Sequence, residues 1–396
     1  MALQLTDEER AMHDGAYGPA VAKAMRILVT LGEIFGAERL VPVASAQISG
    51  VSYQTIGPAG LEFVEGFADE GARVTVPAFL NPCGMDLRRW REMGVPPSFA
   101  ELQLRIIAAY ERMGVTITAT CTPYLAGIVP APGEHLAWAE SSAVSYANSV
   151  LGARTNRESG ISALAAAICG RTPDWGLHRE ENRVAALVVE VTASLRDSTD
   201  FGVLGVHVGR LARGRVPAFT GIPAATPEQL KALGAAMAAS GAVALYFVEG
   251  VTPEWRLVSE PERLTVTGAA LERVRQALHQ ADEPELIALG CPHCSLSELQ
   301  EVAELVQKGL KGRRLWVCTS RAVAGQPAAA AAIAAIEAAG GQVLCDTCMV
   351  VAPLAEMGIR RTATNSGKAA IYLPSLGRQV VTFGSTGEIL TWSENP

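Results

Sequence analysis

The sequence has no run of about 18 consecutive strongly apolar residues, so it predicts no membrane-spanning helix. Positive charge is also scarce: 33 lysines and arginines stand against 40 acidic residues, a net charge of −7. Because nucleic-acid-binding domains carry a basic patch or stripe, nucleic acid is not an expected partner. The N-terminus MALQLTDEER is polar and acidic, unlike a signal peptide. These features together predict a cytoplasmic protein.

The sequence also lacks a fixed-period repeat and a low-complexity linker, so nothing in it predicts a repeat architecture. Apolar material is plentiful instead. Of the 396 residues 49% are hydrophobic and 38 are glycine, enough for large buried cores. A chain of this length is expected to form about two to three domains.

Short β-branched runs alternate with amphipathic segments, several of which begin at Ser or Thr and end at Gly. The expected strands cover residues 73–79, 115–121, 184–191, 242–250, 286–291, 314–318 and 341–346. The expected helices cover residues 85–94, 99–114, 226–241, 295–309 and 328–341. This alternation predicts an α/β fold with βαβ units and mostly parallel sheets. A polar segment before residue 183 marks one boundary, and the C-terminal half is expected to form two small βαβ layers that meet at 286–295. The predicted regions are residues 1–182, 183–290 and 291–396.

Two C-x-x-C pairs stand out among the eight cysteines: Cys291 with Cys294, and Cys345 with Cys348. A structural zinc site usually spaces its pairs about 15–20 residues apart, whereas a predicted helix, strand and helix separate these. A thioredoxin-like dithiol at Cys291 and an iron–sulfur cluster are the other chemical readings. Cysteine is also often a small buried hydrophobe, an interpretation that suits the remaining sites. Those sites are Cys83, Cys169, Cys318 and Cys345.

The cysteines fall at the ends of predicted strands. Cys121, Cys291 and Cys318 each close one, and Cys348 follows another. In open α/β sheets the crevice beyond the carboxyl ends of the strands is where ligands bind. Three or four of these sulfurs are therefore expected to converge there.

A dense polar cluster lies in GEH…ESSAVSYANSVLGARTNRESG. In the functional interpretation His135 moves a proton, with Glu134 or Glu140 tuning it. In the structural interpretation the segment is a solvated loop leading into a capped helix. The expected site residues of this cluster are Glu134, His135, Glu140, Ser141, Ser142, Asn148, Arg154, Asn156 and Arg157.

Three shorter motifs add candidates. Ser320 and Arg321 follow a predicted strand and are expected in the catalytic crevice. The motif TNSGK opens a predicted helix, whose N–H groups suit a phosphate or carboxylate. The loop SGVSYQTIG offers hydroxyl donors. The substrate-binding candidates of these last two motifs are Asn365, Ser366 and Lys368, and Ser49, Ser52, Tyr53 and Thr55.

Long idiosyncratic stretches resemble the large subunit of the aconitase X family. They include ISGVSYQTIGPAGLEFVEGFADEGARVTVPAFLNPCGMDLRRW, TATCTPYLAGIVPAPGEHLAW, GRTPDWGLHREENR, GCPHCSLSEL, LWVCTSRAV, CDTCMVVAPL and TNSGKAAIYLP. The resemblance spans nearly the whole chain. Gln47, in SAQISG, stands where the family commonly has histidine, and is expected at the substrate.

Members of this family are dehydratases with three aconitase-like α/β domains and an iron–sulfur cluster. Their fourth, swivelling domain is either fused or a separate small subunit. The resemblance therefore implies an α/β chain with mostly parallel sheets around a central cluster-binding crevice, lacking the swivel domain and needing a small partner subunit. It leaves open whether the catalytic base is a serine of that domain.

The family acts on small anionic substrates of two kinds. One is (R)-5-phosphomevalonate, dehydrated to trans-anhydromevalonate 5-phosphate in an isoprenoid route. The other is cis-3-hydroxy-L-proline. The sequences of the motifs SGVSYQTIG, LNPCGMDL and CTPYL are more similar to those of the phosphomevalonate type.

By the same resemblance the cluster ligands are Cys121, Cys291 and Cys348, while Cys294 and Cys345 are neighbours. A 4Fe–4S cluster is expected, with 2Fe–2S as the alternative. The competing function of another class is a non-catalytic cluster- or zinc-binding protein.

Overall fold

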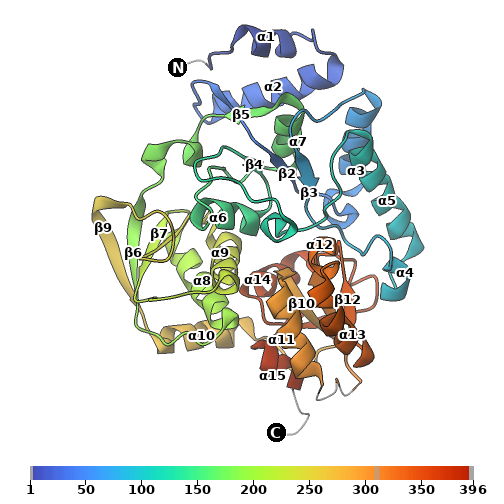
Figure 1. Ribbon diagram of the computed structural model, residues 1–396, viewed down its shortest axis with the longest axis vertical. Coiled ribbons are helices and arrows are strands. Elements are labelled where there is room, and N and C mark those ends of the chain that lie inside the picture. The colour runs from blue at the N-terminus through green and yellow to red at the C-terminus, as the bar shows by residue number, and fades with distance from the viewer. Residues whose placement is uncertain (1–2, 308–309, 311, 392–396) are drawn as a thin grey trace.

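The computed structural model describes residues 3–307, 310 and 312–391. The chain runs from an N-terminal region at the top of Figure 1, through a middle region at the left, to a C-terminal region at the bottom. Its strands form four sheets, and among the described residues every named strand pair except β1–β5 is parallel. The predicted α/β class with mostly parallel sheets is confirmed. No helix in this part of the chain is long and apolar enough to cross a membrane.

The N-terminal region centres on a short parallel sheet of order β3-β2-β4, with a separate antiparallel pair β1–β5. Apolar faces of α2, α3, α5 and α7 form its core. The strands are β1 (Leu40–Pro42), β2 (Ala46–Ile48), β3 (Ala78–Leu80), β4 (Ala137–Trp138) and β5 (Arg171–Pro173). The helices are α1 (Asp7–His13), α2 (Pro19–Ile34), α3 (Tyr53–Asp69), α4 (Trp90–Met93), α5 (Pro97–Arg112), α6 (Ser141–Ser149) and α7 (Gly160–Cys169), with 3-10 helices η1 (Pro123–Ala126), η2 (Gly176–His178) and η3 (Glu180–Asn182).

The middle region is a parallel sheet of order β8-β7-β6-β9 covered by helices. Its strands are β6 (Ala185–Val191), β7 (Pro217–Thr220), β8 (Phe247–Val248) and β9 (Leu257–Val266), and its helices are α8 (Ser198–Ala212), α9 (Pro227–Gly241) and α10 (Gly268–Leu278). Helices α8 and α9 approach so closely that a Cβ atom at Gly205 would lie 2.5 Å from the carbonyl oxygen of Leu233. Glycine is therefore required at this crossing, which fixes the position of α9.

The C-terminal region is a five-stranded parallel sheet of order β12-β11-β10-β13-β14. Its strands are β10 (Leu286–Cys294), β11 (Arg314–Thr319), β12 (Gln342–Leu344), β13 (Arg361–Thr364) and β14 (Val380–Phe383). Its helices are α11 (Leu296–Val306), α12 (Arg321–Ala324), α13 (Ala330–Ala338), α14 (Gly367–Leu376) and α15 (Thr386–Thr391), with 3-10 helix η4 (Pro327–Ala329). Strand β10 runs across residue 290, so a region limit at that residue would cut a strand.

The capped helices agree best with expectation. Thr226 and Gln229 form a reciprocal capping box at α9, and Ser295 and Glu298 form another at α11. The predicted helix over 295–309 is helical to Val306, and residues 308–309 lie outside the described residues. Such caps satisfy N–H groups that have no partner inside the helix, which is why the helices begin there.

Four expectations are wrong in part. The helix expected over 85–94 is confined to α4, because the Asp86 carboxylate accepts the N–H groups of Arg88 (2.9 Å) and Arg89 (3.0 Å) and holds a turn instead. The expected strands 73–79 and 242–250 shorten to β3 and β8. Residues 115–121 form no strand beyond one bridge from Thr116 to Phe79, and Ala119 has a positive φ of 41°.

Candidate active site

Three cysteines from separate segments lie close together where parallel strands end. Cys121 follows Thr120, whose N–H donates to the carbonyl of Leu80 at the end of β3 (3.1 Å). Cys291 lies in β10, and Cys348 lies shortly after β12. The backbone N–H of His293 donates to the Cys121 sulfur at 3.2 Å, and the Cys291 thiol interacts electrostatically with those of Cys121 and Cys348.

Burial raises the pKa of all three thiols, that of Cys291 to about 12. The Lys368 ammonium opposes this pKa increase at each of them. A metal binds cysteine as the thiolate, so a fixed cation beside the thiols favours metal binding.

The donor set fits an iron–sulfur cluster. All eight cysteines are free thiols. Backbone groups of Val350 and Val351 hydrogen-bond to the Cys348 sulfur, as His293 does to Cys121, and Ser366 hydrogen-bonds to Cys291. Hydrogen bonds to sulfur are among the features that tune such clusters. Within the described ranges, no group of three or more His, Cys, Asp or Glu side chains is arranged to hold a single metal ion.

A buried ion pair stands beside the thiols. Lys368 Nζ donates to Glu140 Oε1 and lies 3.3 Å from the Ser142 hydroxyl. Glu140 also caps α6 by accepting the Ala143 N–H (2.7 Å), and Ser142 donates to it (2.5 Å). Burial raises the pKa of Glu140, but Lys368 and these hydrogen bonds lower it below its ordinary value. Both members of the pair are therefore charged at neutral pH.

A cavity of about 360 Å³ opens beside Cys291, between the middle and C-terminal regions. Asn365, Ser366 and Gly367, at the start of α14, line it. Three glutamates of α11 line it as well, and burial together with the neighbouring carboxylate of Glu298 raises the pKa of Glu301. The α14 side is therefore the one suited to an anionic group, because helix N-termini present free N–H donors.

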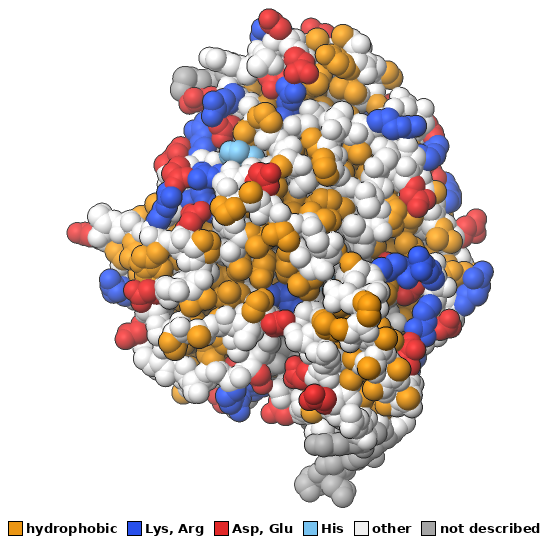
Figure 2. Space-filling model, in the orientation of Figure 1, with side chains coloured by type: hydrophobic (Ala, Val, Ile, Leu, Met, Phe, Trp, Pro, Cys, Tyr) orange, Lys and Arg blue, Asp and Glu red, His pale blue; other side chains and the backbone are white. Residues whose placement is uncertain are grey.

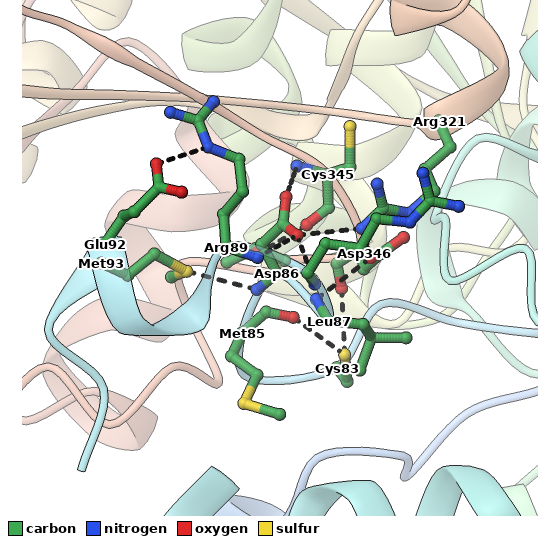
Figure 3. Close-up of polar contacts among 12 residues, drawn as sticks. Cys83, Met85, Asp86, Leu87, Arg89, Glu92, Met93, Arg321, Cys345 and Asp346 are labelled. Atoms are coloured by element: carbon green, nitrogen blue, oxygen red, sulfur yellow. Dashed lines mark hydrogen bonds and ion pairs between the residues drawn. The ribbon is translucent and has the colours of Figure 1, made fainter. Parts of the chain in front are cut away.

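Arg321 lies between two buried carboxylates (Figure 3). Its guanidinium donates to Asp86 (2.9 Å) and to Asp346, and Asp86 in turn accepts the N–H of Cys345 (2.8 Å). Burial raises the pKa of Asp346, and Arg321 opposes this pKa increase. Ser320 caps α12 by accepting the Val323 N–H. Arg321 thus holds the loop before Cys348 through Asp346, whereas Ser320 caps a helix.

His135 and Glu134 lie elsewhere than expected of catalytic residues. They precede β4, whereas Glu140 follows it, so the strand separates them from the carboxyl end of the sheet. His135 Nδ1 lies 2.9 Å from His178 Nδ1, in a hollow that also contains Asp174. The lining of this hollow shares no residue with the cavity beside Cys291.

Other members of the predicted polar cluster are committed to structure. Asn148 bonds to the backbone of Thr155 at both ends of its amide, and Asn156 bonds to the backbone of Trp175 and Leu177. Arg154 forms an ion pair with Glu180 at the hollow that contains His135. Exposed Arg157 lies 3.4 Å from the hydroxyl of Tyr372, on α14. The hydroxyl of buried Ser141 lies 3.5 Å from Glu140 Oε1, beside the Lys368 pair.

The early loop packs against the cysteine-bearing segments. Ser52 Oγ donates to the carbonyl of Val351 (2.8 Å), and the Tyr53 N–H donates to Gln103. Gln47 is fully buried on β2 and donates to the carbonyl of Thr120 (3.1 Å). Its Oε1 has no hydrogen-bond partner among the described residues. The Gln47 amide therefore donates to the residue before Cys121 and keeps an unpaired acceptor oxygen.

Ser49 and Thr55 lie farther out on the same loop. The Ser49 carbonyl would lie 2.3 Å from a Cβ atom at Gly160, and Ser49 lines an apolar groove with Ile161. The Thr55 hydroxyl donates to the carbonyl of Ser52 (2.9 Å).

Family models cover nearly the whole chain. Aconitase X first domain matches residues 2–181, aconitase X second domain residues 185–276, and aconitase X third domain residues 284–393. The chain belongs to the aconitase X family. The resemblance predicted from the motifs is confirmed.

Known aconitase X proteins match it closely. The phosphomevalonate dehydratase large subunit of Methanothermobacter thermautotrophicus is 54% identical over 93% of both chains. The protein of that name from Methanocaldococcus jannaschii is 47% identical over 98% of this chain and 99% of its own. The cis-3-hydroxy-L-proline dehydratase of Pseudomonas aeruginosa is 39% identical over 96% of this chain and 68% of its own. The holo-form crystal structure of Thermococcus kodakaraensis aconitase X is 44% identical, covers 100% of both chains and has a TM-score of 0.92.

Three residues of this aconitase X site were missed in the sequence. His293 lies inside the quoted motif GCPHC, and Asp86 inside NPCGMD, but neither was separated from its cysteine neighbour. Lys231 is buried on α9 and donates to the carbonyl of His293 (3.0 Å). Its signal was a lysine in the apolar stripe of a helix, next to Leu230.

The hollow that contains His135 predicts a pH effect on stability that is separate from catalysis. Burial, and then repulsion from His135, lowers the pKa of His178 to about 3, whereas an unfolded histidine titrates near 6.5. Asp174 opposes this decrease, and Arg183 and Arg154 add to it. Below pH 6.5 the unfolded chain takes up a proton that folded His178 does not. The free energy of unfolding therefore decreases as the pH is lowered.

This contribution should amount to about 1.5 kcal/mol between pH 6.5 and pH 5. His178→Gln removes it, so the difference in the free energy of unfolding between wild type and variant should change by that amount across the interval. Urea denaturation at several pH values measures it. Gln276→Ala, at an exposed and uncharged residue of α10, is the control and should leave the slope unchanged. The same slope in wild type and His178→Gln would contradict the assignment.

Proposed function

We propose that the chain is the large subunit of an iron–sulfur dehydratase that converts (R)-5-phosphomevalonate to trans-anhydromevalonate 5-phosphate. The observation that carries the proposal is a difference in similarity. Four phosphomevalonate dehydratase large subunits are 45–54% identical to this chain, whereas the two cis-3-hydroxy-L-proline dehydratases are 37% and 39% identical. A more distant large subunit, from Aeropyrum pernix, is 37% identical but is still matched over 97% of its length.

The proposed cofactor is a 4Fe–4S cluster held by Cys121, Cys291 and Cys348. Three protein ligands leave one iron open, and an open metal supplies Lewis-acid stabilisation to a departing hydroxyl group. The buried position of Cys121 and Cys291 keeps bulk water from two of the three ligands. Cys348 is the half-buried member of the three.

Residues around the cluster would hold the anionic substrate. Lys368 lies beside the thiols and keeps its charge through Glu140. The start of α14 offers Asn365, the Ser366 hydroxyl and free N–H groups toward the cavity. A phosphate carries close to two negative charges and needs several fixed donors of this kind.

The site offers fewer suitable groups to the alternative substrate, cis-3-hydroxy-L-proline. A hydroxyproline zwitterion needs a carboxylate for its ammonium group, and Glu134 and Glu140 are the two candidates in the sequence. Glu134 precedes β4, away from the carboxyl end of the sheet. Glu140 is already paired with Lys368 and accepts hydrogen bonds from Ser142 and Ala143. Arg154 pairs with Glu180 at the separate hollow that contains His135, and Arg321 lies between Asp86 and Asp346, so neither is proposed as a substrate donor.

The proposed partner is a small subunit that carries the swivel domain. The name large subunit implies a small subunit for the relatives, and this chain aligns with nearly their full length. The face shown in Figure 2 carries hydrophobic side chains across its middle and charged side chains mainly around its edge. Apolar surface with a polar rim is typical of protein–protein contacts, which supports a partner there. A cytoplasmic location stays a prediction.

We also propose the division into three regions, with a first limit near residue 182. The second limit is placed ahead of Leu286 instead of at residue 290, so that β10 stays in one piece.

Turnover should require both subunits. The purified, cluster-loaded chain alone is expected to show no phosphomevalonate dehydration, because the partner completes the site. Adding the small subunit should produce activity that saturates at equimolar protein. The measurement is substrate loss and product formation under anaerobic conditions, with the small subunit alone as the control. Full turnover by the isolated chain would contradict the proposed partner, and a cluster-loaded pair inactive on every substrate would favour a non-catalytic cluster protein.

A further inference from the structure

His293 is a fully enclosed histidine between the segments that carry the three proposed cluster ligands. Its side chain is 1% exposed, and it stands two residues after Cys291. Its ring lies between Thr120 and Thr347, the residues immediately before Cys121 and Cys348. One side chain thus contacts the neighbour of each of the two ligands that come from other segments.

Both ring nitrogens have partners. Nε2 lies 2.9 Å from the carbonyl oxygen of Thr347, which can only accept, so Nε2 carries the hydrogen. Nδ1 lies 3.0 Å from the Thr120 hydroxyl, which can donate to it. The ring therefore connects the Cys121 segment to the Cys348 segment through two directed hydrogen bonds.

The backbone of His293 continues the connection. Its N–H donates to the Cys121 sulfur at 3.2 Å, and its carbonyl accepts from Lys231 Nζ on α9 at 3.0 Å. Lys231 also pairs with Glu298, which belongs to the capping box of α11. His293 is thereby anchored to the middle region while it contacts all three ligand-bearing segments.

We propose that His293 is the positioning residue that holds Cys121, Cys291 and Cys348 in one arrangement competent to bind the cluster. The inference rests on the ligand set proposed above. Any buried histidine needs hydrogen-bond partners, but both partners of this ring stand directly before a proposed ligand on another segment. Groups that orient metal ligands by hydrogen bonds change metal affinity when they are removed, although they do not touch the metal.

The test compares variants that keep or lose these hydrogen bonds. His293→Leu removes both ring hydrogen bonds. His293→Gln keeps a donor able to reach the Thr347 carbonyl. Thr120→Val removes only the hydroxyl that faces Nδ1. The matched control is His178→Leu, another buried histidine, whose partner is His135 in the separate hollow.

The readouts are iron and sulfide per chain after anaerobic reconstitution, the half-life of the cluster absorbance in air, and the electron paramagnetic resonance spectrum of the reduced cluster. His293→Leu should lose its cluster about 10-fold faster than wild type, because removing groups that orient metal ligands typically weakens metal affinity by about 10-fold or more. Thr120→Val should be intermediate, and His293→Gln should recover part of the loss. The control should lower thermal stability without changing the spectrum or the half-life.

The outcomes separate this inference from the ligand set. If wild type holds the cluster and the cysteine variants lose it, but His293→Leu matches wild type in iron content, half-life and spectrum, His293 has no positioning role. If His178→Leu shortens the half-life as much as His293→Leu does, the effect is general destabilisation and the inference is overturned. If variants of Cys121, Cys291 and Cys348 keep the iron content of wild type, both the ligand set and the role of His293 are wrong.

Discussion

Replacing Cys121, Cys291 or Cys348 with serine is expected to remove the iron–sulfur cluster and, with it, all dehydratase activity of the reconstituted enzyme. A serine hydroxyl at neutral pH is a poor substitute for a thiolate, which is the usual ligand of such clusters. The Cys291 thiol interacts electrostatically with those of Cys121 and Cys348, and Lys368 interacts with all three. Each single variant should lose most of its iron and sulfide, because only three protein ligands are proposed.

Cys318 supplies the matched control. It is fully buried on β11 and interacts electrostatically with the same three cysteines, so it shares their surroundings. Lys368, which lowers the pKa of each proposed ligand, is not one of the largest influences on the pKa of Cys318. Cys318→Ser and Cys345→Ser should therefore keep their iron, as measured by metal analysis of anaerobically prepared protein. Iron loss in Cys318→Ser with full retention in Cys121→Ser would contradict the ligand set.

Replacing Lys368 with methionine is expected to lower the free energy of unfolding of the metal-free chain by about 3–5 kcal/mol. The change leaves the Glu140 carboxylate buried, at 4% exposure, without its cation. It also removes the positive charge nearest the three thiols, so the reconstituted enzyme should bind its cluster and substrate poorly. Urea denaturation measures the first effect, and iron content the second.

A double variant separates the charge pair from the packing of the lysine. Lys368→Met with Glu140→Gln removes both charges and should recover part of the lost stability, because no uncompensated charge remains. The exposed pair of Arg89 and Glu92 is the control: Glu92→Gln should cost no more than about 1 kcal/mol. A loss in Lys368→Met no larger than in this control would contradict the buried-pair interpretation.

Apolar periodicity and helix caps in the sequence predicted those helices and strands whose formation depends mainly on nearby residues. Helices α5, α9 and α11 have long apolar stripes that begin at proline or at a capping residue, and they form where expected. Strands β6 and β11 are apolar runs buried in parallel sheets, which is also a strong pattern.

The failures have tertiary causes. Residues 115–121 have the composition of a strand, but Thr118 and Thr120 bond to Leu80 and Ala119 turns the backbone, so Cys121 is delivered by an irregular segment. Composition cannot show this, because the partner of the segment is distant in the chain.

Only part of the candidate site could be predicted from the sequence, again because its contacts are tertiary. Glu140 and His135 are close in sequence, yet β4 places them at opposite ends of the sheet, and ligands bind at the carboxyl end. Lys368 and Glu140 are far apart in sequence and meet in an ion pair. The connecting role of His293 depends on Thr120 and Thr347, which no sequence pattern links to it.

This chain, with its small subunit, is expected to dehydrate phosphomevalonate. The most direct test is the ratio of kcat/KM for (R)-5-phosphomevalonate and cis-3-hydroxy-L-proline, measured anaerobically on the reconstituted, cluster-loaded pair. We expect efficient conversion of phosphomevalonate to trans-anhydromevalonate 5-phosphate and no detectable reaction of hydroxyproline. Dehydration of hydroxyproline, with no reaction of phosphomevalonate, would contradict the account.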